Sequence, residues 1–255
     1  ATATADHTRI EESHDQGVIA YRAGSTVTLT ECEVRATAPR GDGTQGVGVV
    51  AHTNARVTLR RVLVRDNTHV GVIAYGSGAV LDAHDVMVTG TRALMADAAG
   101  ASLVAHTGGA VTGDHLALSN NIDAALEAYG AGSTVVLEDV VIAPFDDAAR
   151  PRGFGAVAAA DGAVTLTRVG VRDVDGAGLA ALLAEASPGG ASLTATDVFV
   201  ETVTPRRFGG AEAPFGYALA VERSRMTLAR ATVLGGEYGF VVNEGNLALT
   251  EAVVF

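Results

Sequence analysis

The segments GVIAYRAGSTVTL (17–29), GVIAYGSGAVLDA (71–83) and ALEAYGAGSTVVL (125–137) repeat one pattern, and each begins 54 residues after the one before. Between them lie VVAHTNARVTLRRVLV (49–64) and LVAHTGGAVTGDHLAL (103–118), which are also 54 residues apart. The 54-residue unit therefore contains two related halves, one with the letters AY and one with the letters AHT.

Each half contains an apolar residue that opens a strand, and these anchors follow one another at intervals of 21 to 33 residues. The anchors are Val27, Val57, Leu81, Val111, Val135, Val164, Leu193, Met226 and Leu247. The residue seven positions after each anchor is aliphatic in all nine cases, and Ile10 takes the equivalent position in a partial coil before them. Apolar and polar residues alternate at period two between glycine-rich breaks, which predicts short strands rather than helices.

Three short strands in each turn of about this length predict a solenoid whose coils stack on one another. We therefore expect an all-β protein: a single right-handed parallel β-helix of about nine coils over residues 1–255. The pattern resembles the repeats of the pectin lyase-like superfamily along nearly the whole chain. That superfamily includes lyases, hydrolases, adhesins and phage tailspikes, so the resemblance implies a fold and leaves the function open. The hexapeptide period of left-handed β-helices is absent.

The first strand of each coil should point alternate residues inward, because side chains alternate between the faces of a strand. The inward set includes the alanines Ala20, Ala51, Ala74, Ala105, Ala128 and Ala158. The outward set is Ile19, Val50, Ile73, Val104, Glu127 and Val157. Glu127 decides the assignment, since an unpaired carboxylate is costly to bury. The next outward position forms what we call the Tyr/His ladder, which consists of Tyr21, His52, Tyr75, His106 and Tyr129.

Two interpretations of the Tyr/His ladder stay open: packing copied by duplication of the repeat, or a ligand-binding face. In the second case, tyrosines two strand spacings apart, about 9.6 Å, would stack on sugar rings or contact an apolar partner.

The composition limits the partners of the chain. The formal charge is −11, the pI is about 5.0, and all 18 basic residues are arginine. An acidic surface repels phosphate backbones, which argues against nucleic acid as a partner. No apolar run reaches the roughly 18 residues of a membrane helix, so we expect no membrane insertion. The single cysteine, Cys32, lies in an inward column and is expected in the core.

Connections between coils alternate in length, and the longer ones should all leave the same corner. The densest charged cluster lies in one of them and comprises Asp146, Asp147, Arg150 and Arg152. Carboxylates with arginines could bind calcium and an anionic sugar, or act as acid and base; a solvated, salt-bridged loop is the alternative. The resemblance implies motifs such as NTD, GHG and RIK for hydrolases and R-x-P-x-x-R for lyases, and none of these is present.

Two further pairs stand at equivalent positions. His84 and His115 lie near neighbouring turns, where a solvated corner is the expectation and a zinc site the alternative, and we expect no metal. Asn67 and Asn121 fall in the shorter connections, where asparagine suits left-handed turns and bonds its own backbone.

The leading hypothesis is a non-catalytic scaffold or adhesin-like module, secreted or displayed on a bacterial surface, that binds glycan or protein. The alternative is a polysaccharide lyase or glycoside hydrolase that acts on an acidic polysaccharide through the longer loops. The chain begins and ends inside coils, so we expect a segment of a longer protein, or ends that associate with further copies or flanking coils.

Overall fold

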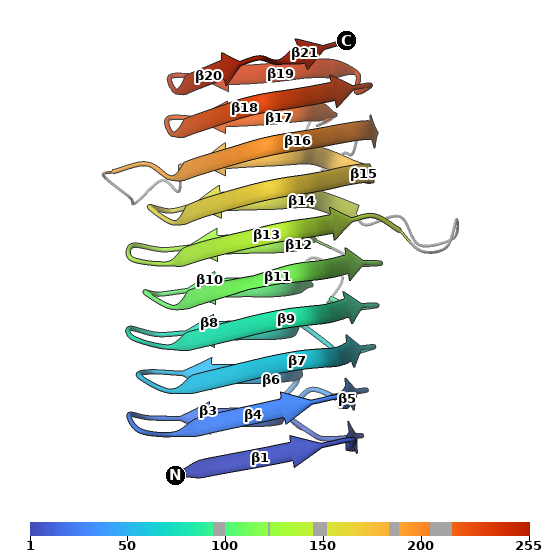
Figure 1. The fold of residues 1–255 in the computed structure, drawn as a ribbon, viewed down its shortest axis with the longest axis vertical. Helices are drawn as coiled ribbons and strands as arrows, with labels where there is room; N and C mark the ends of the chain where they lie inside the picture. Colours follow the sequence, from blue (N-terminus) through green and yellow to red (C-terminus); the bar gives the residue numbers. More distant parts are fainter. Residues whose placement is uncertain (94–99, 122, 145–151, 184–188, 205–215) are drawn as a thin grey trace.

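The computed structural model describes residues 1–93, 100–121, 123–144, 152–183, 189–204 and 216–255. Within these residues the chain forms 21 strands and no helix, and the coils rise from the N-terminus to the C-terminus as a right-handed parallel solenoid (Figure 1). All recorded strand pairs are parallel, and each strand pairs with the equivalent strand one coil away. The expected fold class is confirmed. No helix in this described part could cross a membrane.

One face of the solenoid, which we call the first face, is built from the strand that opens each coil. Its strands are β3 (Gln16–Tyr21), β6 (Val47–His52), β8 (Val70–Tyr75), β10 (Ala101–His106), β12 (Ala124–Tyr129), β14 (Arg152–Ala159), the end of β15 (Ala163–Leu182), β17 (Tyr217–Glu222) and β19 (Tyr238–Asn243). The described chain thus contains nine first-face strands, in agreement with the expected number of coils.

The other two faces carry the second and third expected strands. They are separate strands at the two ends: β1 (Thr2–Asp6) with β2 (Arg9–Glu11), β4 (Thr26–Thr30) with β5 (Glu33–Arg35), and β20 (Asn246–Thr250) with β21 (Val253–Val254). Between them the two strands run on as one bent strand: β7 (Arg56–Arg65), β9 (Val80–Thr89), β11 (Ala110–Ser119), β13 (Thr134–Ile142), β15, β16 (Ser192–Thr204) and β18 (Arg225–Leu234). One left-handed residue at the corner turns the chain, and the pairing resumes in register at the residue that follows it.

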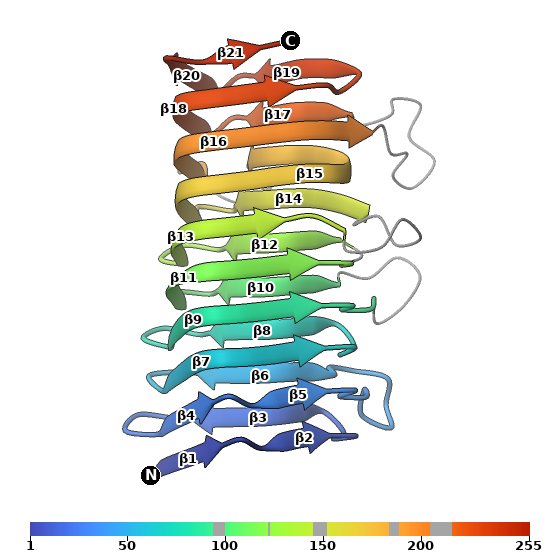
Figure 2. The same cartoon turned by 45° about the vertical axis from the view of Figure 1, so that its right-hand side comes forward.

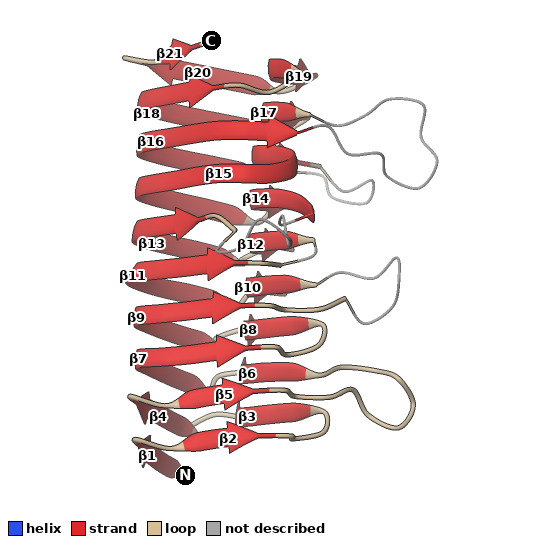
Figure 3. Cartoon of the chain, turned by 90° about the vertical axis from the view of Figure 1, so that its right-hand side faces the viewer, coloured by secondary structure: helices blue, strands red, loops and turns tan. Residues whose placement is uncertain are grey.

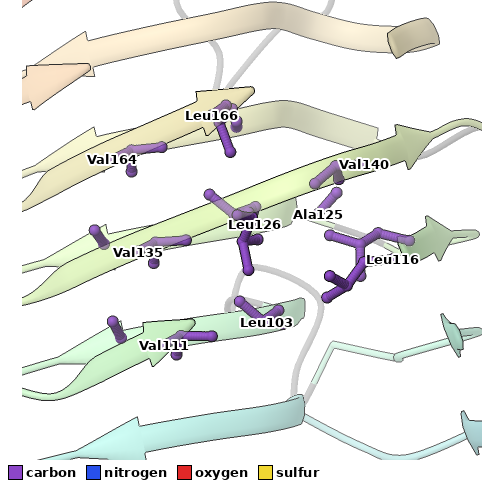
Figure 4. Close-up of a cluster of buried hydrophobic side chains, with 14 of the residues drawn as sticks. Leu103, Val111, Leu116, Ala125, Leu126, Val135, Val140, Val164 and Leu166 are labelled. Carbon is purple, nitrogen blue, oxygen red and sulfur yellow. The ribbon is translucent and has the colours of Figure 1, made fainter. Parts of the chain in front are cut away.

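The register is the one that the repeat predicts. The nine anchors pair in sequence from Val27 to Leu247, and the aliphatic residues seven positions later pair from Val34 to Val254. Ile10 of the partial coil pairs with Val34. Inward residues of all three faces form one continuous core, which includes the buried Cys32, and Figure 4 shows how leucines and valines from successive coils meet inside it.

The bend between the second and third faces carries a column of ten charged or titratable residues, which we call the corner column. From the first coil to the last it consists of His7, Glu31, Arg61, Asp85, His115, Asp139, Arg168, Asp197, Arg230 and Glu251. Basic and acidic residues alternate without exception, and every member has a φ between 48° and 56°. Left-handed geometry costs an L-residue roughly 1–2 kcal/mol. Glycine adopts this conformation at a lower cost, yet each of the ten positions holds a charged or titratable residue instead.

Neighbours in the corner column form ion pairs. Arg61 lies 2.7 Å from a carboxylate oxygen of Glu31, and Arg230 lies 2.6 Å from one of Asp197. Arg168 bonds Asp139 at 2.6 Å and also contacts Glu138. The hydrogen bond from Arg230 lowers the pKa of Asp197, and the charge of Arg168 adds a smaller contribution. The column therefore links coils by charge complementarity on a solvated edge.

We predict that Arg168→Glu lowers the thermal unfolding midpoint at low salt, because it places four carboxylates within adjacent coils. The loss should shrink in about 1 M salt, where screening acts within roughly 3 Å. Arg56→Glu is the matched control, since it makes the same charge change at an exposed position that forms no ion pair within the described part of the chain. Equal midpoints for the two variants at low salt would contradict a stabilising role of the column.

Candidate functional site: a groove on the first face

The Tyr/His ladder lies in register on the first face, as the sequence predicts. Tyr21 pairs with His52, which pairs with Tyr75, and the sequence continues through His106 to Tyr129. Successive ring centroids are 4.8, 5.2, 5.3 and 4.9 Å apart. The five rings form one continuous column, because a histidine fills each gap between tyrosines. His106 is stacked between Tyr75 and Tyr129, with interplanar angles of 19° and 18°, whereas the contacts of His52 with Tyr21 and Tyr75 are tilted by 58° and 39°.

This stack changes how the ladder can contact a ligand. The prediction of sugar rings stacked on separated tyrosines does not fit it, because the faces of the inner rings already contact neighbouring rings. Tyr21, Tyr75 and Tyr129 keep exposed fractions of 47%, 39% and 37%. The accessible part of the ladder is therefore a row of ring edges with their hydroxyl and imidazole nitrogen atoms.

A threonine orients each histidine of the ladder. Thr53 Oγ1 lies 2.8 Å from Nδ1 of His52, and Thr107 Oγ1 makes the same short contact with Nδ1 of His106. Both threonines have positive φ, which turns the side chain back towards the preceding ring. The repeated letters AHT thus encode a histidine whose Nδ1 is occupied and whose Nε2 is left for another partner.

Beside the ladder runs a groove with a volume of about 600 Å³. Its lining residues are Gln16, Gln45, Val47, Val50, His52, His69, Val70, Ile73, Tyr75, Ala101, Val104, His106, Glu127 and Tyr129. They come from the first-face strands β3, β6, β8, β10 and β12 and from the connections that precede them. Five adjacent strands span roughly 19 Å along the solenoid axis, so the groove suits an elongated ligand.

The floor of the groove is the predicted outward column. Val50 and Val104 point away from the core as expected, yet both are only 3% exposed. They pack with Val47, Val70 and Ala101 into a second apolar cluster outside the solenoid. On the far wall the Gln16 side-chain amide donates to Gln45 Oε1 at 2.9 Å.

Glu127 occupies the same outward column, as the sequence predicts, but it is largely shielded from solvent. Its carboxyl group lies in the groove between Val104 and Val157 in the paired strands, and it has no recorded partner among the described residues. Burial raises the pKa of Glu127 to about 7, and the charge of Asp123 adds to the rise. An outward direction therefore did not mean exposure to solvent.

His69 is a groove residue that the sequence analysis did not identify. It precedes β8 with a φ of 74°, and its Nδ1 is buried without a hydrogen-bond partner in the described part of the chain. Burial lowers the pKa of His69 and also that of His106, so both imidazoles are neutral at pH 7. The only sequence signal was a histidine just before a first-face strand.

The charged cluster predicted in one of the longer connections lies almost entirely outside the described residues. Asp146, Asp147 and Arg150 lie outside the described residues, and Arg152 is described only through its backbone, which opens β14 and pairs with Asp175. The strands β5, β9 and β16, which the longer connections follow, end on one side of the solenoid (Figures 2 and 3). In the connection after β5, Arg40 forms an ion pair of 2.5 Å with Asp15.

The paired histidines lie on another face. His84 Nδ1 and His115 Nδ1 each lie 2.9 Å from Asp114, and Asp82 is 3.2 Å from His84 Nε2. The hydrogen bond to Asp114, with the charges of Asp114, Asp139 and Asp85, raises the pKa of His115. Burial opposes the charged form of His84, but hydrogen bonds to Asp114 and Asp82 and their charges raise its pKa overall. The described residues contain no group of three or more side chains arranged to hold a metal ion.

The paired asparagines differ from the prediction. Asn67 is buried, and its Oδ1 accepts from the backbone N–H of Thr37 in the preceding coil rather than from its own turn. The left-handed conformation falls one residue earlier, at Asp66 and Asn120. Among the described residues, the buried side-chain amide of Asn121 has no hydrogen-bond partner. Asn67 therefore joins coils instead of shaping the turn.

No protein-family model matches the chain, and no curated protein matches it. Among solved structures it is similar to the Dettilon tailspike protein gp208, with 14% identity over 88% of this chain and a TM-score of 0.32. It is also similar to the tailspike protein gp49 from Pseudomonas phage LKA1, with 11% identity over 99% of this chain and a TM-score of 0.32.

The chain spans about half the length of either tailspike structure, 47% and 51% respectively. A hyper-glycosylated TibA fragment is similar over 98% of this chain and 100% of its own, with 14% identity and a TM-score of 0.21. The fold assignment rests on the strand pairing of the chain itself, and membership of the pectin lyase-like superfamily stays a resemblance of pattern.

Proposed function

We propose that this chain is a glycan-binding module of a secreted or surface-displayed protein. The observation that carries the proposal is the groove of about 600 Å³ beside the column of five rings in the Tyr/His ladder. An extended sugar chain would lie along the solenoid axis, with apolar ring faces over Ile73, the partly exposed aliphatic residue of the floor. Its hydroxyl groups would bond the edges of the Tyr/His ladder.

Spacing supports a glycan. The ladder presents a hydrogen-bonding edge every 4.8 to 5.3 Å along the axis, which is close to the advance of an extended chain by one pyranose. Concave sites that are mostly apolar with a few placed polar groups are typical of ligand binding. A protein ligand could use the same groove, and an array that includes peptides beside glycans would reveal it.

We predict that Tyr75→Ala weakens glycan binding at least tenfold, because it removes the central ring and leaves His52 and His106 without their stacking partner. Tyr75→Phe keeps the stack and removes only the hydroxyl group, so its loss should be smaller. Calorimetry with the best ligand from a glycan array measures both effects.

Tyr238→Ala is the control for this series, since Tyr238 is 50% exposed but lies away from the groove. Equal affinity of Tyr75→Ala and the unaltered chain would exclude the ladder from the binding site. A reducing-end and lyase assay on the same ligands decides between binding and cleavage. Turnover that requires Asp146 or Asp147 would instead support the enzyme hypothesis and place the reaction on the longer loops.

A further inference from the structure

The outward column of the first face contains one carboxylic acid among aliphatic residues. From the first coil to the last the column consists of Ile19, Val50, Ile73, Val104, Glu127, Val157, Ala180, Ala220 and Val241. Eight of these nine positions hold an aliphatic residue, so the fold accepts an aliphatic side chain in this column. The carboxyl group of Glu127 is therefore not needed for packing, and a partly buried acid without a partner opposes stability.

The described groove supplies no positive charge for Glu127. The chain has no lysine, and none of the described lining residues is an arginine. Asp123 acts on Glu127 with a negative charge, and burial lowers the pKa of both His69 and His106. The groove therefore favours a cation and repels the carboxylates of acidic polysaccharides.

A compact ammonium group matches this site. It presents three donors and no acceptor, and its charge is best used beside a carboxylate that is shielded from water. Tyr129 lies two residues from Glu127 on the same side of β12, so its hydroxyl group offers a second acceptor at the end of the ladder. A sugar held against Tyr129 would bring a ring substituent towards the carboxyl group.

We propose that the groove binds glycans whose sugars carry free amino groups, and that Glu127 receives one ammonium group. This inference rests on the glycan-binding function proposed above and names the class of sugar. Glu127 is half ionised near pH 7, where amino sugars are also close to losing their proton. Binding should therefore be strongest near neutrality and fall on both sides, since acid protonates the carboxylate and base deprotonates the amine.

The test uses the tetramer of glucosamine and its fully N-acetylated counterpart, with affinities measured by calorimetry between pH 5.5 and 8.5. We expect the free amine to bind at least tenfold more tightly near pH 7, with a bell-shaped profile. Glu127→Gln should remove most of this preference. Glu138→Gln is the control, because Glu138 is an exposed acid on another face of the next strand, β13.

A second measurement does not depend on the variant. Carbon NMR of the Glu127 carboxyl group should show its titration midpoint move to lower pH when the glucosamine tetramer binds. Binding of the N-acetylated tetramer with no preference for the amine would overturn the inference and leave the glycan-binding function standing. Capture of trilysine through Glu127 with no binding of either tetramer would overturn both and assign the groove to a basic peptide.

Discussion

Replacing Glu127 with valine should raise the free energy of unfolding at pH 8 by roughly 3 kcal/mol and leave it almost unchanged near pH 4. The fold holds the pKa of Glu127 at about 7, whereas the unfolded chain has the ordinary value of 4.5. A raised pKa means that the folded state binds the proton more tightly. The stability gained from this tighter proton binding is complete below pH 4.5 and is lost as the pH rises through 7. The difference between the two pKa values corresponds to roughly 3 kcal/mol of unfolding free energy.

Urea unfolding at pH 4, 6 and 8 measures the effect as a difference between the variant and the unaltered chain, so contributions of other groups cancel. Valine is the residue in the adjacent coils, at Val104 and Val157, and it should pack without strain. Glu237→Val serves as the control, since Glu237 is an exposed acid with no ion pair recorded among the described residues. A gain that is the same at pH 4 and pH 8 would show that packing, rather than ionisation, is responsible.

Leu126→Ala, one residue away, should lower the free energy of unfolding, which is the opposite of the effect expected for Glu127→Val. Leu126 is fully buried and points into the core, where Figure 4 shows it beside Leu103 and Leu116. Removal of a buried leucine side chain typically costs about 2–5 kcal/mol, because it removes apolar burial and leaves a cavity. The loss should be equal at pH 4 and pH 8, since no titrating group is involved.

The same urea series measures this loss. Val136→Ala, on another face of the same coil, is the control, because Val136 is 48% exposed and the loss of stability on its truncation should stay small. A cost below 1 kcal/mol for Leu126→Ala would mean that the coils relax into the cavity. Two adjacent residues with opposite effects would verify the alternation of faces on which the description of the groove depends.

The register of this fold is readable from the sequence because it depends on a local repeat. An anchor such as Val57 contacts the equivalent residues Val27 and Leu81 of adjacent coils, so alignment of the repeat is already alignment in space. The ladder of tyrosines and histidines follows from the same register. Its stacking could also be anticipated, since equivalent side chains in parallel strands lie one strand spacing apart.

The groove was less predictable because its properties depend on what packs outside the solenoid. Alternation gives the direction of Val50 and Glu127 but not their burial, which arises from an apolar cluster built across several coils. The unpartnered nitrogen of His69 and the threonines beside the ladder histidines depend on left-handed backbone at those positions. Such conformations are not encoded by residue type when histidine or threonine adopts them.

The strict alternation of the corner column has a consequence for how such a chain can grow or shrink. Loss of a single coil would bring two acids or two bases together on the edge and would place two tyrosines or two histidines side by side in the ladder. Loss or gain of two coils, the 54-residue unit, preserves both sequences. Recombination between repeats is therefore tolerated when it adds or removes an even number of coils. The natural unit for lengthening this solenoid is the pair of coils.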